Sequence, residues 1–293
     1  MNCTLCPRTC NAPRAGGKNG FCGVPAEALV CRAAPHYGEE PCISGSRGSG
    51  AVFFAGCNLR CVFCQNHEIS RGEAGTPVTA AQLREIFLRL REQGVHNINL
   101  VTPTHCTEVI IEALTGAKLD IPVVWNSSGY ESVETLRRLE GLVQIYMPDF
   151  KYADPVLAGR YSAAPDYPSA ALAAIREMFR QVGPFQMDDD GILQRGLLIR
   201  HLILPGAPEN TLRVIDAVED HFPPKQILFS LMSQYTPMPG LEAYPELQRP
   251  VTQAEYDRCA SYLDFSDIEF GYYQSPESAT EEMIPAFDGT GVK

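Results

Sequence analysis

The chain has 293 residues, of which 45% are hydrophobic, and it carries a formal net charge of −11. This composition supports a sizeable core and argues against global disorder. The acidic balance argues against a general binder of nucleic acid or anionic membranes, because both are polyanions. No apolar run approaches the length of a membrane span, and the first residues lack the apolar stretch of a signal peptide. Eleven cysteines in such a chain favour metal ligation in a reducing cytoplasm over disulfides.

Residues 1–50 are rich in Cys, Gly and Pro and show little hydrophobic periodicity. We expect a small segment that needs metal staples, because it cannot bury much apolar surface unaided. Four of its cysteines follow the spacing C-x₂-C-x₃-C-x₁₁-C, and they are Cys3, Cys6, Cys10 and Cys22. This spacing predicts a second metal site, either structural Zn²⁺ or an auxiliary iron–sulfur cluster. Cys31 and Cys42 are further candidates or simple thiols.

From residue 51 to residue 293, short β-rich runs alternate with helical ones. Strands are expected at 51–55, 97–101, 122–125, 143–147, 197–204 and 226–231, with a possible last strand at 267–272. Helices are expected at 80–90, 105–115, 131–139, 169–181, 209–220 and 252–263, the first opened by a capping box of Thr79 and Gln82. Repeated β-then-α units imply a parallel sheet with right-handed crossovers. Six such units predict an α/β fold, an open (β/α)₆ partial barrel, whose chemistry gathers at the C-terminal ends of the strands.

The loop after the first of these strands carries Cys57, Cys61 and Cys64 in the spacing C-x₃-C-x₂-C. A [4Fe–4S] cluster usually takes four Cys ligands, so three ligands leave one iron open to a substrate or cofactor. A structural zinc site is the alternative interpretation. Zinc sites usually want four protein ligands in paired knuckles, and this triad has no fourth ligand nearby. The triad therefore predicts an iron–sulfur cluster with an open coordination position.

This spacing, with the aromatic Phe63 before the last cysteine, resembles the radical S-adenosylmethionine (radical SAM) superfamily. The resemblance implies the same open barrel, with the open iron chelated by the amino and carboxylate groups of SAM. It also implies that an electron from the cluster cleaves SAM to methionine and a 5′-deoxyadenosyl radical, which abstracts hydrogen from a substrate. An oxygen-labile cluster of this kind requires a reducing, low-oxygen cytoplasm and an electron donor such as flavodoxin or ferredoxin.

A narrower resemblance extends over nearly the whole chain, to the branch of radical SAM proteins named for similarity to pyruvate formate-lyase-activating enzyme. The segments that carry it are 36–70, 100–105, 124–130, 146–152 and 195–206, together with the Cys-rich stretch 3–22. In the activases of that group, the positions corresponding to Asp149, Lys151 and His201 contact SAM. The resemblance implies that these three residues contact SAM here.

Polar residues follow the predicted strands at the ends where ligands bind. Thr102 opens a loop whose backbone carbonyl corresponds to one that holds the SAM amino group. Asn126 and Ser128 suit the ribose hydroxyls or the carboxylate of SAM, although such residues also cap helices. Asp149 and Lys151 are two residues apart, so they point to the same side and can grip a zwitterionic amino acid, or form a solvated ion pair.

Two further residues have two interpretations each. His201 lies inside an apolar run, so it either faces the lumen and contacts SAM or is a core histidine. Cys106 is either a reactive thiol or a small buried hydrophobe. Taken together, the sequence predicts a radical SAM oxidoreductase acting on an unidentified small molecule or peptide. The alternatives are an activase that installs a glycyl radical on a partner enzyme, and a non-catalytic iron–sulfur electron carrier.

Overall fold

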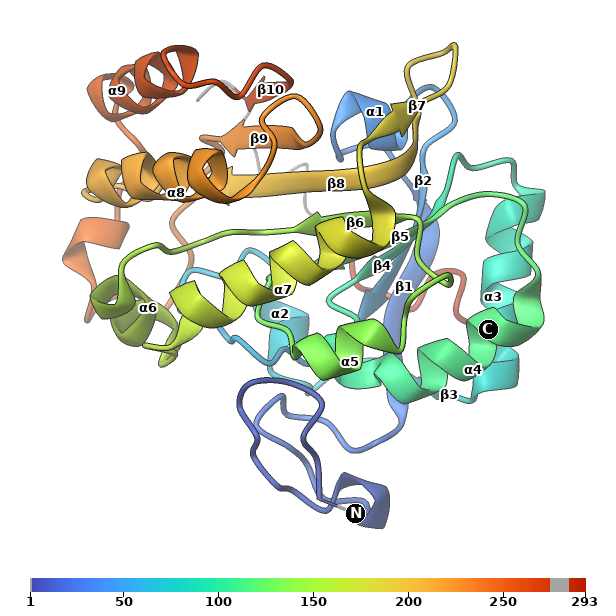
Figure 1. Cartoon of the computed structure of the whole chain (residues 1–293). Helices are drawn as coiled ribbons and strands as arrows, with labels where there is room; N and C mark the ends of the chain where they lie inside the picture. Colours follow the sequence, from blue (N-terminus) through green and yellow to red (C-terminus); the bar gives the residue numbers. More distant parts are fainter. Residues whose placement is uncertain (1, 275–284) are drawn as a thin grey trace.

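The computed structural model describes residues 2–274 and 285–293, and one twisted ten-stranded sheet forms its centre (Figure 1). The main path has the order β10-β9-β8-β6-β5-β4-β2-β1-β3, and β7 pairs with β8 off this path. The strands are β1 Ala28–His36, β2 Ser49–Phe54, β3 Thr76–Val78, β4 Ile98–Val101, β5 Val123–Ser127, β6 Ile145–Pro148, β7 Gln186–Met187, β8 Leu193–Leu202, β9 Leu228–Met232 and β10 Gly271–Gln274. The strands from β2 to β10 on the main path are parallel, whereas β1 pairs antiparallel with both β2 and β3.

Helices connect the parallel strands and cover the outer face of the sheet (Figure 1). They are α1 Pro41–Ser44, α2 His67–Ser70, α3 Ala80–Glu92, α4 Thr107–Ala117, α5 Val133–Arg137, α6 Pro155–Ser162, α7 Tyr167–Val182, α8 Pro208–His221 and α9 Gln253–Asp264. The edge strands β3 and β10 do not pair with each other among the described residues. The sheet is therefore open, and the predicted α/β partial barrel is confirmed. No helix in the part of the chain that the structure describes is long and apolar enough to cross a membrane.

Local sequence signals set the helix boundaries. The Thr79 side chain accepts a hydrogen bond from the Gln82 backbone, and the Gln82 side chain accepts one from the Thr79 backbone, so the predicted capping box is present. A second capping box, of Thr252 and Glu255, opens α9. Helix α6 was not predicted, although Asp154 caps its N-terminus and a proline occupies its first turn.

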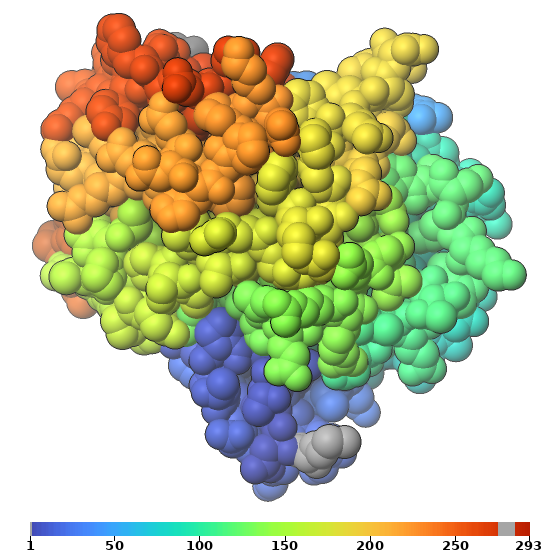
Figure 2. Space-filling view, in the orientation of Figure 1, coloured from blue at the N-terminus to red at the C-terminus, as the bar shows by residue number. Residues whose placement is uncertain are grey.

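Strand β1 was not among the predicted strands, the first of which was placed at 51–55. Ala28–His36 pair with β2 in an antiparallel register, with Val30 opposite Phe54. Cys31, a candidate metal ligand, is 1% exposed on this strand. Residues 2–27 do lack strands and long helices, and Figure 2 shows them as a lobe, in dark blue, that projects from the main body. The division of the chain into domains at residue 50 stays a prediction.

Candidate active site

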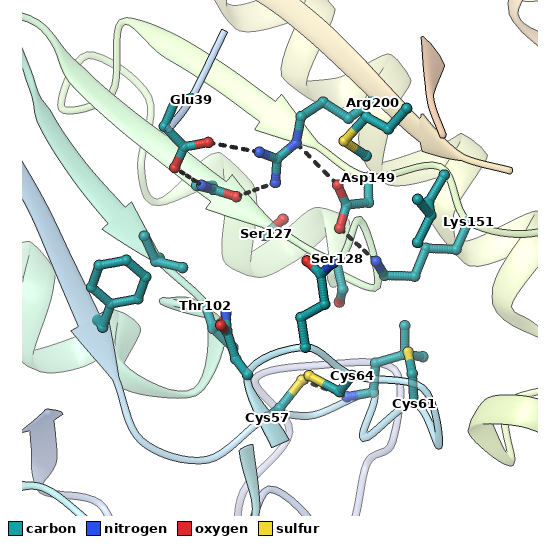
Figure 3. Close-up of a pocket in the computed structure, with 18 of the residues that line it drawn as sticks. Glu39, Cys57, Cys61, Cys64, Thr102, Ser127, Ser128, Asp149, Lys151 and Arg200 are labelled. Atoms are coloured by element: carbon teal, nitrogen blue, oxygen red, sulfur yellow. Dashed lines mark hydrogen bonds and ion pairs between the residues drawn. The ribbon is translucent and has the colours of Figure 1, made fainter. Parts of the chain in front are cut away.

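A cavity lies at the C-terminal ends of the parallel strands (Figure 3). Its volume is about 220 Å³, whereas a single buried water needs only about 15 Å³, so it is too large for a packing defect. Its lining includes Glu39, Cys57, Cys61, Cys64, Thr102, Asn126, Ser127, Ser128, Asp149, Lys151, Arg200 and Gln234. The triad and five of the six predicted SAM-contacting residues thus line one cavity.

The triad lies in the loop that follows β2, and buried hydrogen bonds hold this loop. The Nε2 atom of His105 lies 2.7 Å from the carbonyl oxygen of Ala55, so Nε2 carries the proton. Burial lowers the pKa of His105 to about 4, which keeps the ring neutral. Gly56 has a φ of +85°, and a Cβ there would lie 2.7 Å from the carbonyl oxygen of Cys22. Only glycine fits at this close approach.

The three thiols fit an iron–sulfur cluster better than a single ion. Burial and, to a lesser extent, neighbouring triad thiols raise the pKa of Cys57 and raise that of Cys64 to about 12, and Lys151 opposes the shift. Metal binding must therefore displace protons from these sulfurs. Within residues 2–274 and 285–293, no three His, Cys, Asp or Glu side chains converge closely enough to hold one metal ion. Thiols spread over one wall suit a cluster, because each thiolate then binds a different iron.

Asp149 holds two cations on the opposite side of the cavity (Figure 3). Its Oδ2 lies 2.6 Å from the Nζ of Lys151, and its Oδ1 lies 3.1 Å from the Nε of Arg200. Burial alone would raise the pKa of Asp149, but Lys151 and Arg200 hold it below its usual range. Burial likewise opposes the charge on Lys151, but Asp149 and the nearby Cys61 raise its pKa. The result is a buried array of fixed charges that faces the triad.

Arg200 and Glu39 are site residues that the sequence analysis missed. Arg200 Nη1 lies 2.9 Å from Glu39 Oε2, and Arg200 Nη2 donates to the side-chain oxygen of Asn126 at 2.7 Å. The other Glu39 oxygen accepts from the amides of Asn99 and Asn126. Glu39 follows β1, which was itself not predicted; the one sequence signal was that the segment 36–42 leads into the strand before the triad. Arg200 immediately precedes His201, the residue of this strand that the sequence analysis predicted to contact SAM.

The predicted polar residues at the ends of β4 and β5 also reach the cavity. Thr102 has a φ of +60°, which is rare for a β-branched residue, and its backbone N–H donates to the carbonyl of Asn126 at 2.8 Å. Such strain clusters at functional sites. The Oγ of Ser128 is buried and has no hydrogen-bond partner among the described residues. A buried hydroxyl without a partner at a cavity wall is available to a ligand.

His201 does not reach the cavity, which corrects its predicted role. It is 0% exposed, and its Nδ1 lies 2.7 Å from the carbonyl oxygen of Phe150 while its Nε2 lies 2.9 Å from Thr211 Oγ1. Successive residues of a strand face opposite sides, so Arg200 points into the cavity and His201 points away. Cys106 is 1% exposed and does not line the cavity, so it matches the small-hydrophobe interpretation.

The N-terminal cysteines lie in the projecting lobe, but among the described residues they do not converge closely enough to hold one metal ion. A Cβ on Gly20 would lie 3.3 Å from the sulfur of Cys22 and 3.5 Å from that of Cys10. Arg14 Nη1 lies 3.7 Å from the sulfur of Cys3. Cys6 instead lies beside Asn58 of the triad loop, and burial raises its pKa to about 12. A metal in this lobe would therefore require its thiols to move together.

Comparison with known proteins agrees with this geometry. Residues 51–183 match the family model described as the radical SAM superfamily. A domain of this superfamily implies a [4Fe–4S] cluster and SAM. An uncharacterised protein of Methanocaldococcus jannaschii is 27% identical over 281 residues, which cover 92% of this chain and 77% of that protein.

Two solved structures share the fold. SuiB of Streptococcus suis bound to the precursor peptide SuiA has a TM-score of 0.51 and 14% identity, over 78% of this chain and 49% of SuiB. SuiB bound to S-adenosylmethionine has a TM-score of 0.50 at the same identity, over 78% of this chain and 48% of SuiB. This chain thus spans about half the length of the solved structures that it matches. At this identity the likeness concerns the fold alone.

Proposed function

We propose that this protein is a radical SAM enzyme that reductively cleaves SAM to methionine and a 5′-deoxyadenosyl radical. The radical abstracts hydrogen from a small-molecule or peptide substrate. One observation carries the proposal: Cys57, Cys61 and Cys64 line the same cavity as the charged pair Asp149 and Lys151. A bound [4Fe–4S] cluster would supply the electron and an open iron.

The cavity residues match the chemistry of SAM group by group. The ammonium of Lys151 suits the methionyl carboxylate, and the carboxylate of Asp149 suits the amino group. The Oγ of Ser128, which lacks a partner in the described part of the chain, can accept or donate a hydrogen bond to a ribose hydroxyl. Thr102, whose backbone is strained, lines the same cavity. Arg200 and Glu39, which also line the cavity, hold Asp149 and Asn126 in place through ion pairs and hydrogen bonds.

The finer assignment, to the branch similar to pyruvate formate-lyase-activating enzyme, is also our proposal, and it rests on the sequence segments given above. The first alternative, an activase for a glycyl-radical enzyme, follows from this assignment. The second, an electron carrier without catalysis, is independent of it. The fixed charges facing the triad weigh against a carrier, which needs no ligand site. SuiB binds a precursor peptide, so peptides belong among the substrates to test.

We further propose a metal in the N-terminal lobe, held by Cys3, Cys6, Cys10 and Cys22, as either Zn²⁺ or an auxiliary iron–sulfur cluster. The approach of Cys10 and Cys22 around Gly20 supports the proposal. Metal analysis of protein purified without oxygen distinguishes the two. One zinc per chain supports the structural ion, whereas iron beyond four atoms per chain supports the cluster. The absence of both contradicts the proposal.

The proposed reaction is tested by forming 5′-deoxyadenosine from SAM after anaerobic reconstitution and reduction with dithionite. The test variant replaces all three triad cysteines with alanine. A matched variant replaces three buried cysteines that lie outside the cavity, Cys31, Cys42 and Cys106. We expect product from the wild type and the matched variant and none from the triad variant. Equal product from the triad variant, or none from a wild type with a reducible cluster, would contradict the proposal.

A further inference from the structure

The side chain of Arg8, from the N-terminal lobe, is inserted behind the triad loop. Its Nε donates to the carbonyl of Asn58 at 2.9 Å, and Nη2 donates to the carbonyl of Leu59 at 3.2 Å. On the other side, Nη2 donates to the carbonyl of Ser162 at 2.6 Å, and Nη1 donates to the carbonyl of Ala163. One guanidinium thus links the turn between Cys57 and Cys61 to the end of helix α6.

This turn needs an external donor. Arg60 has a φ of +57°, so the chain reverses too tightly here for its carbonyls to continue a β ladder. Asn58 and Leu59 are nearly fully buried, so water cannot replace a missing donor. A charged guanidinium with several N–H groups in a fixed fork can satisfy carbonyls on two sides at once, whereas a lysine provides only a point charge.

Other contacts fix Arg8 in this position. Its guanidinium lies 4.0 Å from the centre of the Phe21 ring and 5.2 Å from that of the Tyr130 ring. Tyr130 is itself bound to the turn, because its carbonyl accepts a hydrogen bond from the Asn58 side chain at 2.6 Å. Next to Phe21, the carbonyl of Cys22 accepts a hydrogen bond from the backbone N–H of Cys57 at 3.1 Å. The lobe therefore contacts the triad loop on both sides of the turn.

Ser162 connects this contact to a triad sulfur. Its Oγ donates to the sulfur of Cys61 at 3.1 Å and lies 2.8 Å from the hydroxyl of Tyr152. A serine hydroxyl has one proton, so Tyr152 donates to Ser162 and Ser162 donates to Cys61. Hydrogen bonds to ligand sulfurs stabilise the reduced, more negative form of an iron–sulfur cluster and so raise its reduction potential.

We propose that Arg8 is a positioning residue for the triad, which shapes the Cys57–Cys61 turn and holds Ser162 against the Cys61 sulfur. The inference rests on the proposed function only in assuming that the triad binds a cluster. The lobe then has a role in this chain whether or not it binds a metal. Its arginine sets how firmly the cluster is retained and how easily it is reduced.

The test compares Arg8→Ala and Ser162→Ala with Arg195→Ala. Arg195 is a matched control, because it also donates to two backbone carbonyls, those of Val182 and Gln181, far from the cavity. The readouts are the rate of iron loss to a chelator and the midpoint potential from an EPR-monitored redox titration. We expect Arg8→Ala to weaken cluster retention by about 10- to 100-fold, the range for partners of metal ligands. We expect Ser162→Ala to retain iron and to shift the potential in the negative direction.

Iron loss and potential in Arg8→Ala equal to those of Arg195→Ala would overturn the proposal. If Arg8→Ala fails to fold, Ser162→Ala decides, because an unchanged potential in that variant contradicts the link between Ser162 and Cys61. These outcomes are separate from the proposed function. A wild type that retains its cluster but forms no 5′-deoxyadenosine counts against the reaction and leaves the role of Arg8 open to the same measurements.

Discussion

The substitution Arg200→Met tests whether the charge array of the cavity is built as described. Arg200 contacts carboxylates of Glu39 at 2.9 Å and Asp149 at 3.1 Å, and its side chain is 14% exposed. Removing one partner of a buried ion pair costs about 3–5 kcal/mol, because the other charge stays buried. Both carboxylates keep other donors, namely Lys151 for Asp149 and amides for Glu39, so we expect the lower end, about 3 kcal/mol.

The matched control is Arg91→Met. Arg91 forms an even closer pair with Asp120, at 2.6 Å, but the two side chains are 42% and 62% exposed. Exposed pairs contribute about 0–1 kcal/mol, so the control should lose little stability. The assay is urea unfolding of the metal-free protein, followed by circular dichroism and by fluorescence of the single tryptophan, Trp125, which is fully buried. Coincident transitions from the two probes would justify a single free energy of unfolding.

The pH dependence gives a second check. The pKa of Asp149 is lowered in the folded protein, so its stabilising contribution is present above its unfolded value of about 3.9 and is lost as pH falls through the folded value. In Arg200→Met one of the two cations that lower this pKa is absent. The difference between wild type and variant should therefore shrink as pH falls. A loss no larger than that of Arg91→Met, or a difference independent of pH, would refute this account of the site.

Three further predictions concern other positions. Burial lowers the pKa of His201 to about 4, against about 6.5 unfolded, so about 3 kcal/mol of stability is lost as pH falls from 6.5 to 4. His201→Gln should reduce the pH dependence of the melting temperature over this range and leave SAM affinity unchanged. Weaker SAM binding would contradict the placement of His201 outside the cavity. Thr102→Gly should leave the free energy of unfolding in urea unchanged or raise it by up to about 1 kcal/mol, because glycine relieves the positive φ. The control Thr104→Gly loses a buried hydrogen bond and should destabilise the protein. Equal losses of stability in the two variants would refute the backbone strain at Thr102. Lys151→Gln should weaken SAM binding, measured by calorimetry, about 10- to 100-fold, since a charge-assisted hydrogen bond contributes about 1.5–3 kcal/mol. The control Lys225→Gln, at an exposed lysine, should leave SAM affinity unchanged. Equal SAM affinities of the two variants would show that Lys151 does not bind SAM.

The alternation of strands and helices could be predicted from the sequence because its signals are local. The capping box at Thr79 lies within four residues, and the triad lies within eight. The C-terminal ends of the strands could therefore also be predicted, and with them the cavity residues Thr102, Asn126 and Ser128. By contrast, β1 was missed because it pairs antiparallel with β2 and β3 beside a mainly parallel sheet, and because it lies in a Cys-rich region.

The choice between Arg200 and His201 shows where sequence reasoning reached its limit. Strand β8 is covered on both faces, with Leu198 on the inner side and Ile199 packed against the helices. Apolar residues occupy both faces of the strand, so the hydrophobic periodicity of the sequence does not reveal which face points into the cavity. The partner of Arg200, Glu39, is 161 residues away in the chain, and only the folded sheet brings the two together.

The central claim, that the triad holds a cluster whose open iron binds SAM, is tested most directly by EPR spectroscopy of the reduced, reconstituted protein with and without SAM. We predict a reduced [4Fe–4S] signal that SAM changes in the wild type and that is absent from the variant lacking Cys57, Cys61 and Cys64. A reduced cluster signal that is identical with and without SAM would contradict the claim and favour an electron carrier.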